Sequence, residues 1–153
     1  MIVVSDTSAI TSLLQIQRAD LLASLYHEVV IPAAVERELR HDHPVLPDFI
    51  HVAHISNPHV VQRLVLEVDR GEAEAIALML AKRGDVLLID ERRGRRVAQR
   101  EGVPVIGLLG VLAEAKRRGL LDSLRDTLDA LQRVAGFRIS SDLKARVLAE
   151  VGE

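Results

Sequence analysis

The sequence contains no cysteine and no tryptophan, and its 153 residues include only one tyrosine and two phenylalanines. Without cysteine the chain has neither a disulfide framework nor a thiolate metal site, which suits a reducing compartment. With so few aromatic rings, base stacking cannot be a main device for recognising nucleic acids. Composition therefore excludes the small disulfide-rich proteins and favours recognition by shape and charge.

Long apolar runs are also missing. No stretch reaches the roughly 20 apolar residues that a membrane span needs, and the first residues, M-I-V-V-S-D, lack the basic segment of a secretory signal. We therefore expect a cytoplasmic protein without a membrane contact. A hydrophobic content of 48% is enough to build the core of one domain.

Neither sign of charge dominates, since the net charge is only −2. The basic residues are nevertheless clustered, with five arginines between positions 92 and 100 and a second group at 116–118. Such a cluster is most often a solvated helix face. Arg95 and Arg96 follow a predicted strand closely, and we consider them as contacts for a phosphate backbone.

Segments typical of strands and of helices alternate along the chain. Short β-branched runs predict strands at 2–5, 29–31, 51–55, 86–89 and 103–106. Helices are predicted at 9–16, 21–25, 58–68, 72–82, 92–101 and 107–118, with a further one that has Pro32 at its first position. Residues 41–48 carry two prolines and predict a loop. This alternation indicates an α/β fold, a three-layer sandwich with a parallel five-stranded sheet flanked by helices.

The last thirty residues have a different pattern. Apolar residues at three- and four-residue spacing predict an amphipathic helix; they are Leu121, Leu124, Leu128, Leu131 and Val134. Ser140 is expected to cap a final short helix. We therefore divide the chain into a domain at 1–120 and a C-terminal helical extension at 121–153 packed on it. The leucines exceed what the first 120 residues need as cover, which predicts a homodimer or a small protein partner.

Acidic residues stand where the predicted sheet would gather functional groups, at the carboxyl ends of its strands. Asp6 follows the first strand and Asp90 follows the fourth. A helix of about 17 Å that starts at Glu72 is followed by a return strand of about the same length, so Glu72 should lie at the same end as Asp90. On a helical wheel Glu38 falls within the apolar arc, whereas Glu36 points away.

Four converging carboxylates repel one another and raise their own pKa values unless a cation lies between them. A site of oxygen ligands without cysteine or histidine suits Mg²⁺ or Mn²⁺. Such an ion activates water and stabilises charge on a phosphate, so the implied substrate is a phosphodiester.

Each acidic residue also has a purely structural interpretation. Asp6, Glu72 and Asp90 are all suited to cap or begin a helix, and Glu38 could pair with an arginine. The histidines at 41, 43, 51 and 54 suggest zinc only weakly, because none of the usual ligand spacings is present.

Five segments in order resemble the PIN domain, and in particular the prokaryotic branch related to VapC-type toxins of toxin–antitoxin pairs. They are V-V-S-D-T-S-A-I at 3–10, I-P-A-A-V-E-R-E-L at 31–39, G-E-A-E-A-I-A-L at 71–78, L-L-I-D-E at 87–91 and the run that begins R-R-V-A-Q-R at 95. The likeness extends over about residues 1–120. It implies a five-stranded parallel sheet, cleavage of RNA that depends on Mg²⁺ or Mn²⁺, and frequent homodimers.

The resemblance assigns the four acidic positions to Asp6, Glu38, Glu72 and Asp90, and it places Ser8 beside the first of them as a supporting hydroxyl. The third position is Glu where many members have Asp, and Glu74 follows two residues later as its competitor. Glu72 shares a helical stripe with Ile76, whereas Glu74 lies about 160° away and should face elsewhere. The G-T pair found after the last strand of related sequences is Gly107-Leu108 here.

The sequence thus predicts a metal-dependent endoribonuclease, with an RNA substrate and possible pairing with a small antitoxin. One alternative is a non-catalytic PIN-like module that binds RNA or protein. A second is an α/β phosphohydrolase with Asp6 as nucleophile, which normally needs an aspartate where this chain has Ser8.

Overall fold

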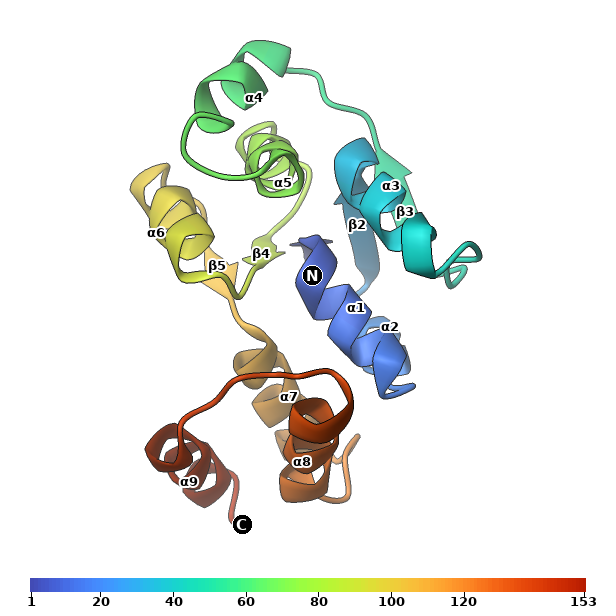
Figure 1. Cartoon of the computed structure of the whole chain (residues 1–153), viewed down its shortest axis with the longest axis vertical. Coiled ribbons are helices and arrows are strands. Elements are labelled where there is room, and N and C mark those ends of the chain that lie inside the picture. Colours follow the sequence, from blue (N-terminus) through green and yellow to red (C-terminus); the bar gives the residue numbers. More distant parts are fainter.

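The centre of the molecule is a five-stranded sheet in which each strand runs parallel to its neighbours, in the order β3-β2-β1-β4-β5. The computed structural model describes all 153 residues. The strands are β1 (Ile2–Ser5), β2 (Glu28–Pro32), β3 (Ile50–Ala53), β4 (Val86–Leu88) and β5 (Val105–Ile106). The predicted parallel sheet is confirmed, and Figure 1 shows its strands enclosed by helices.

Nine helices connect and cover these strands. They are α1 (Thr7–Gln15), α2 (Asp20–Leu25), α3 (Ala33–Asp42), α4 (Pro58–Leu64), α5 (Arg70–Leu80), α6 (Arg92–Arg100), α7 (Leu108–Arg117), α8 (Leu124–Val134) and α9 (Ser141–Glu150). None of them is long and apolar enough to cross a membrane.

Most helix boundaries differ from the prediction by one or two residues, and those of α3 and α4 differ in ways that the structure explains. Pro32 is the last residue of β2 and the N-cap of α3, so it precedes the first helical position instead of occupying it. α3 continues into the predicted loop as far as Asp42. α4 ends at Leu64 instead of 68, because Asp69 takes an extended backbone conformation to cap α5 and the chain must leave the helix before it.

Side chains of the strands alternate between two apolar cores, as the period of a strand requires. Val3 packs with α1, α2 and α7 on one face of the sheet, whereas Val4 packs with α4, α5 and α6 on the other. Parallel sheets are normally covered on both faces in this way. The arrangement confirms the three-layer α/β sandwich.

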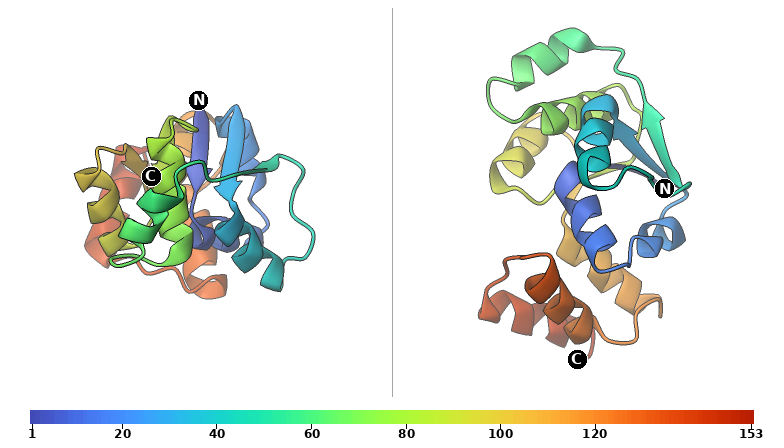
Figure 2. Two further views of the ribbon diagram at one scale, coloured as in Figure 1. Left: turned by 90° about the horizontal axis from the view of Figure 1, so that it is seen from above. Right: turned by 45° about the vertical axis from the view of Figure 1, so that its right-hand side comes forward.

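The C-terminal extension shares the first of these cores. Leu121, Leu124, Leu128 and Leu131 are buried in the same cluster as Val3. The Glu153 carboxylate accepts hydrogen bonds from the N–H groups of Leu124 and Arg125, which ties the end of α9 to the start of α8. Our argument for a partner from these leucines was therefore wrong, because this chain's own core covers them. Figures 1 and 2 show α8 and α9 beside α7, at the end of the molecule away from α4.

β1 and β4 bring two acidic residues together. They are neighbouring strands with Ser5 opposite Leu88, and the Asp6 N–H donates to the Leu88 carbonyl at 3.0 Å. The chain leaves both strands at the same edge of the sheet, which is the edge of their carboxyl ends. Asp6 and Asp90 therefore lie close together there, where α1 and α6 begin.

Candidate active site

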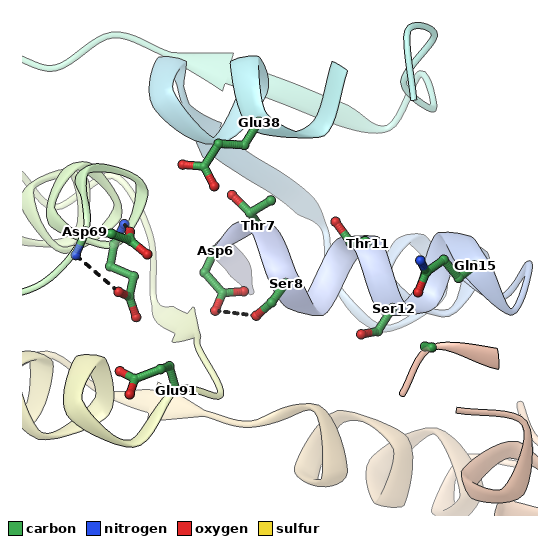
Figure 3. Close-up of a pocket in the computed structure, with 11 residues that line it drawn as sticks. Asp6, Thr7, Ser8, Thr11, Ser12, Gln15, Glu38, Asp69 and Glu91 are labelled. Carbon is green, nitrogen blue, oxygen red and sulfur yellow. Dashed lines mark hydrogen bonds between the residues drawn. The ribbon is translucent and has the colours of Figure 1, made fainter. Parts of the chain in front are cut away.

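A cavity of about 440 Å³ opens beyond the carboxyl end of β1. Figure 3 shows acidic side chains at one end of it and a row of polar side chains from α1 extending away from them. Only one of its eleven lining residues is hydrophobic. The lining consists of Asp6, Thr7, Ser8, Thr11, Ser12, Gln15, Glu38, Asp69, Glu72, Glu91 and Ala135. Three of the four predicted acids, and Ser8, therefore meet at one cavity.

Asp6 both caps α1 and borders the cavity. Its Oδ1 accepts from the Ala9 N–H at 3.1 Å, and its Oδ2 accepts from the Ser8 hydroxyl at 3.2 Å. The residue is 4% exposed. Burial is the main cause that raises its pKa to about 7, and the charge of Asp90 adds to it, while the Ala9 N–H opposes the shift. Asp6 therefore has the structural role that we considered for it without losing its place in the cavity.

Asp90 is not part of the lining of the cavity. Its Oδ1 accepts from the Leu108 N–H at 2.9 Å, so it caps α7, whereas Glu91 caps α6. Burial raises the pKa of Asp90, and both the Leu108 N–H and the charge of Arg95 oppose this. The close approach needs Gly107, because a Cβ there would stand 3.0 Å from Oδ1 of Asp90.

Glu72 is the third residue of α5 and forms a capping box with Asp69. The Glu72 N–H donates to Asp69 at 2.8 Å, and Glu72 Oε1 accepts weakly from the Asp69 N–H at 3.4 Å. Oε2 is buried and has no hydrogen-bond donor. Burial and the neighbouring Asp69 charge raise the pKa of Glu72 to about 8. A buried carboxylate oxygen is normally paired with a cation or a hydrogen-bond donor, and Oε2 of Glu72 has neither.

Glu38 borders the cavity from α3, opposite Asp6 (Figure 3). Its side chain is exposed, so the expected position on the buried face of α3 was wrong. Glu38 forms no ion pair with an arginine. Its carboxylate lies close to the backbone of Gly71, where an added Cβ would stand 2.7 Å from Oε1 of Glu38. The small residue at position 71 therefore allows Glu38 to lie over the start of α5, near Glu72.

Glu74 points away from the cavity, as its place on the helical wheel predicted. Its Oε1 accepts from the Ala34 N–H at 3.0 Å, and its Oε2 accepts from Arg70 at 2.9 Å. Pro32, the N-cap of α3, offers no side-chain acceptor to that helix, and the buried Glu74 supplies one from α5. Glu74 thus holds together the two helices that carry Glu38 and Glu72.

The family model of the PIN domain matches residues 2–153. The chain belongs to the PIN-domain family. PIN domains are generally nucleases and typically use divalent metal ions, so the cavity lies in a protein of a nuclease family. The match includes α8 and α9, beyond the boundary at 120 that we placed from the sequence. Neither a curated protein nor a solved structure matched the chain with significant similarity.

The acidic end of this PIN domain has the chemistry of a site for Mg²⁺ or Mn²⁺, but its side chains stand apart. No three side chains among His, Cys, Asp and Glu are close enough to hold one ion. The donors are all oxygens, and Glu72 Oε2 is buried without a partner. No arginine or lysine forms an ion pair with Asp6, Glu38 or Glu72 to satisfy them instead. The donor set fits a hard divalent cation, and rotation of the glutamate side chains would have to complete the coordination.

The two arginines considered for phosphate binding differ in their surroundings. The Arg95 guanidinium is half-buried and donates to the Ile89 carbonyl at 2.9 Å. A Cβ on Gly107 would stand 2.9 Å from the same nitrogen, so Arg95 lies against the loop that carries Asp90. Arg96 is exposed and forms no hydrogen bond or ion pair. Only Arg96 is free to bind a phosphate without breaking an existing contact.

Sequence reasoning overlooked several residues at this cavity. Asp69 and Glu91 add two carboxylates. Glu91 directly preceded a predicted helix, whereas Asp69 caps α5 because that helix begins at Arg70, two residues before the predicted start. Thr7, Thr11 and Ser12 recur at helical spacing along α1, but of the hydroxyls only Ser8 was singled out. Gly71 and Gly94 carry no sequence signal, because their importance comes from side chains that approach them from other elements.

Proposed function

We propose that this PIN domain is an endoribonuclease that depends on Mg²⁺ or Mn²⁺. The observation that carries the proposal is the buried, donor-free Oε2 of Glu72 at the same cavity as Asp6, whose pKa is raised to about 7. Both groups are costly to keep ionised without a cation. The PIN-domain membership supplies the reaction class, a nuclease.

Asp6 and Glu72 are the residues that would hold the ion, with Glu38 on the opposite wall of the cavity. Asp90 is close enough to Asp6 for its negative charge to raise the pKa of Asp6. A bound divalent cation supplies a lower pKa for an attacking water and offsets charge on the phosphate oxygens. Ser8 holds Oδ2 of Asp6 and so fixes the orientation of that carboxylate.

Hydrolysis forms one bond from a water oxygen to phosphorus and breaks one phosphorus–oxygen bond to the leaving ribose. A proton leaves the water and another reaches the leaving oxygen. Asp69 and Glu91 border the cavity as further carboxylates within the acidic cluster, suited to accept or relay such protons. Arg96, exposed on the helix that begins after the cavity-lining Glu91, is the cation that we assign to the phosphate backbone of the substrate.

The test is cleavage of a labelled single-stranded RNA by the purified chain. We expect cleavage with Mg²⁺ or Mn²⁺ and none in EDTA. Asp6→Asn should abolish it, whereas Glu150→Gln, a change of the same kind at an exposed position of α9, should not. Full activity in EDTA, or in the Asp6 variant, would contradict the proposal. Binding of RNA without cleavage in any metal would favour the non-catalytic alternative.

From the resemblance to VapC-type toxins we further propose that the protein acts as the toxin of a toxin–antitoxin pair. Induced expression should then arrest growth of a bacterial host, and Asp6→Asn should relieve the arrest. A homodimer or a complex with a small antitoxin is part of the same proposal. Its mass by light scattering at tens of micromolar distinguishes a monomer from a dimer.

A further inference from the structure

The cavity extends well beyond its acidic end. From Asp6 it follows one face of α1 as far as Gln15, a distance of roughly 13 Å at the rise of an α-helix. Figure 3 shows this run of polar side chains leading away from Glu38 and Glu91. A site for a metal ion alone does not need such a length, because an ion contacts only its immediate ligands.

The face of α1 is polar but uncharged. It presents the hydroxyls of Thr7, Ser8, Thr11 and Ser12 and the amide of Gln15. The Thr7 Oγ1 atom is shielded from solvent and has no hydrogen-bond partner. Each hydroxyl both donates and accepts a hydrogen bond, and an amide side chain offers one group of each kind. Such a surface binds neutral polar groups, and it lacks the positive charge that binds phosphate.

The C-terminal extension also contributes to the cavity. Ala135, the C-cap of α8, is its single hydrophobic lining residue. Figure 3 shows the faint red ribbon of the C-terminal extension on the side of the cavity where Ser12 and Gln15 lie. Arg133 and Arg138, on either side of it in sequence, are exposed and form no ion pair. The lining therefore runs from an acidic cluster to the C-terminal extension, which carries two unpaired arginines within three residues of Ala135.

We propose that the α1 face binds the ribose and base of the nucleotide next to the cleaved phosphate, in a single strand of RNA that leaves the cavity past Ala135. This proposal takes RNA as the substrate from the proposed function, on which it rests, and it adds the place where that RNA binds. Hydroxyl side chains match the 2′-hydroxyl, which is both donor and acceptor and distinguishes RNA from DNA. The free arginines then meet the next phosphates as the strand emerges.

The size of the cavity agrees with a single strand. About 440 Å³ lies at the lower end of the range for sites that enclose a small organic ligand. It accommodates an unpaired nucleotide, whereas double-stranded RNA is recognised on an extended surface that follows its grooves. Ala135 belongs to the lining, so the extension borders the path that we propose for the strand.

A titration followed by NMR tests where the strand binds. The ¹⁵N-labelled protein is titrated with a four-nucleotide RNA in Ca²⁺, which takes the same oxygen ligands, and the RNA is checked for cleavage afterwards. We expect shifts of the amide signals from residues 7–15 and from Ala135. The DNA of the same sequence should shift the α1 signals less. Shifts confined to α6, or equal effects of RNA and DNA on α1, would overturn the assignment.

Kinetics of two variants give a second readout. Ser12→Ala and Thr11→Val remove one hydroxyl each from the α1 face, and both should raise KM several-fold with little change in kcat. Ser141→Ala, the same change at an exposed position of α9, is the matched control and should leave KM unchanged. The penalty should shrink when the substrate carries a 2′-deoxy sugar beside the cleaved bond. An unchanged KM in both α1 variants would contradict the proposal.

These experiments separate the two proposals. If the chain cleaves RNA but residues 7–15 neither shift nor affect KM, only the assignment of the α1 face fails. If the chain does not cleave RNA but the tetranucleotide still shifts the α1 signals, the nuclease proposal fails and the binding site stands.

Discussion

Gly94 of α6 lies directly against the carboxylate of Glu72 on α5. A Cβ at position 94 would overlap Glu72 Oε2 and would stand 2.7 Å from Cδ1 of Ile89, closer than real side chains approach. The helix that precedes β4 in the chain and the helix that follows it therefore meet at the buried carboxylate, and a hydrogen atom is all that fits between them. This contact fixes the position of the acid that lacks a hydrogen-bond donor.

Gly94→Ala should displace Glu72 and reduce cleavage at least tenfold. Overpacking costs about 1–3 kcal/mol, and alanine recovers up to about 1 kcal/mol through its helix propensity, so we expect a net loss of stability. Gly110→Ala is the matched control in α7, where the added Cβ would stand 2.9 Å from Cγ1 of Ile106. It also overpacks the protein but meets no carboxylate, so it should lower stability without a comparable loss of activity. Activity and urea denaturation should be measured for both. Wild-type activity of a folded Gly94→Ala protein would show that Glu72 does not need its present position.

Glu72→Gln and Glu74→Gln should differ strongly in their effect on the rate of cleavage. Glu72→Gln removes the charge that would hold a cation, and we expect the rate to fall by about a hundredfold. Glu74→Gln keeps an acceptor for the Ala34 N–H and loses only the ion pair with the exposed Arg70, which should cost at most about 1 kcal/mol and leave the rate within a few-fold. Both are assayed at saturating Mn²⁺, with circular dichroism to confirm folding. The reverse result would move the third acidic position to Glu74.

The metal-free protein should become less stable as the pH rises from about 4 to about 8. Folding raises the pKa of Asp6 from 3.8 to about 7 and that of Glu72 from 4.5 to about 8. Between these values the folded chain binds more protons than the unfolded chain, so its free energy of unfolding falls with pH. The melting temperature in EDTA should drop accordingly, and less steeply in Asp6→Asn.

Mn²⁺ should counteract this loss, because an ion that binds only the folded chain stabilises it and competes with the protons on its ligands. We expect Mn²⁺ to raise the melting temperature clearly at pH 8 and very little at pH 5. A metal-free melting temperature that rises with pH, or a Mn²⁺ effect that is larger at pH 5, would count against Asp6 and Glu72 as ligands.

Arg96→Ala should weaken substrate binding without changing the chemical step. A lost phosphate contact raises KM and lowers the salt dependence of binding by about one ion. Arg100→Ala is the control on the same helix, since Arg100 is already bound to Glu67 and Glu101. KM and kcat are compared for both variants at several salt concentrations. Equal effects of the two changes would indicate a general loss of positive charge instead of a specific contact.

Much of the fold followed from local patterns. The five strands were visible because runs such as Val86–Leu88 are short and β-branched or apolar, and helices recur between them. Parallel order then placed Asp6 and Asp90 at one edge of the sheet, since it brings the carboxyl ends of all strands together. The predicted orientation of Glu74 away from the cavity also followed, because a helix fixes the angle between residues two positions apart.

Other features depended on contacts between elements that are distant in the chain. Glu74 caps α3 across forty positions, and no local pattern could show that Pro32 leaves that helix without a side-chain acceptor which α5 supplies. The leucines of α8 had the same helical spacing whether they faced a partner or this chain's own core, and only the packing placed them in the core.

The sequence by itself determined the order of the elements, the sheet edge that collects the acids and the oxygen-only chemistry of the donors, because each of these depends on residue type and on spacing within one element. Only the tertiary structure decided which acids border the cavity, that Asp90 caps α7 instead of lining it, and that Ala135 of the extension joins the α1 face in the lining. Burial, empty space and the absence of a hydrogen-bond donor belong to the surroundings of a side chain, and those surroundings exist only once distant segments have packed together.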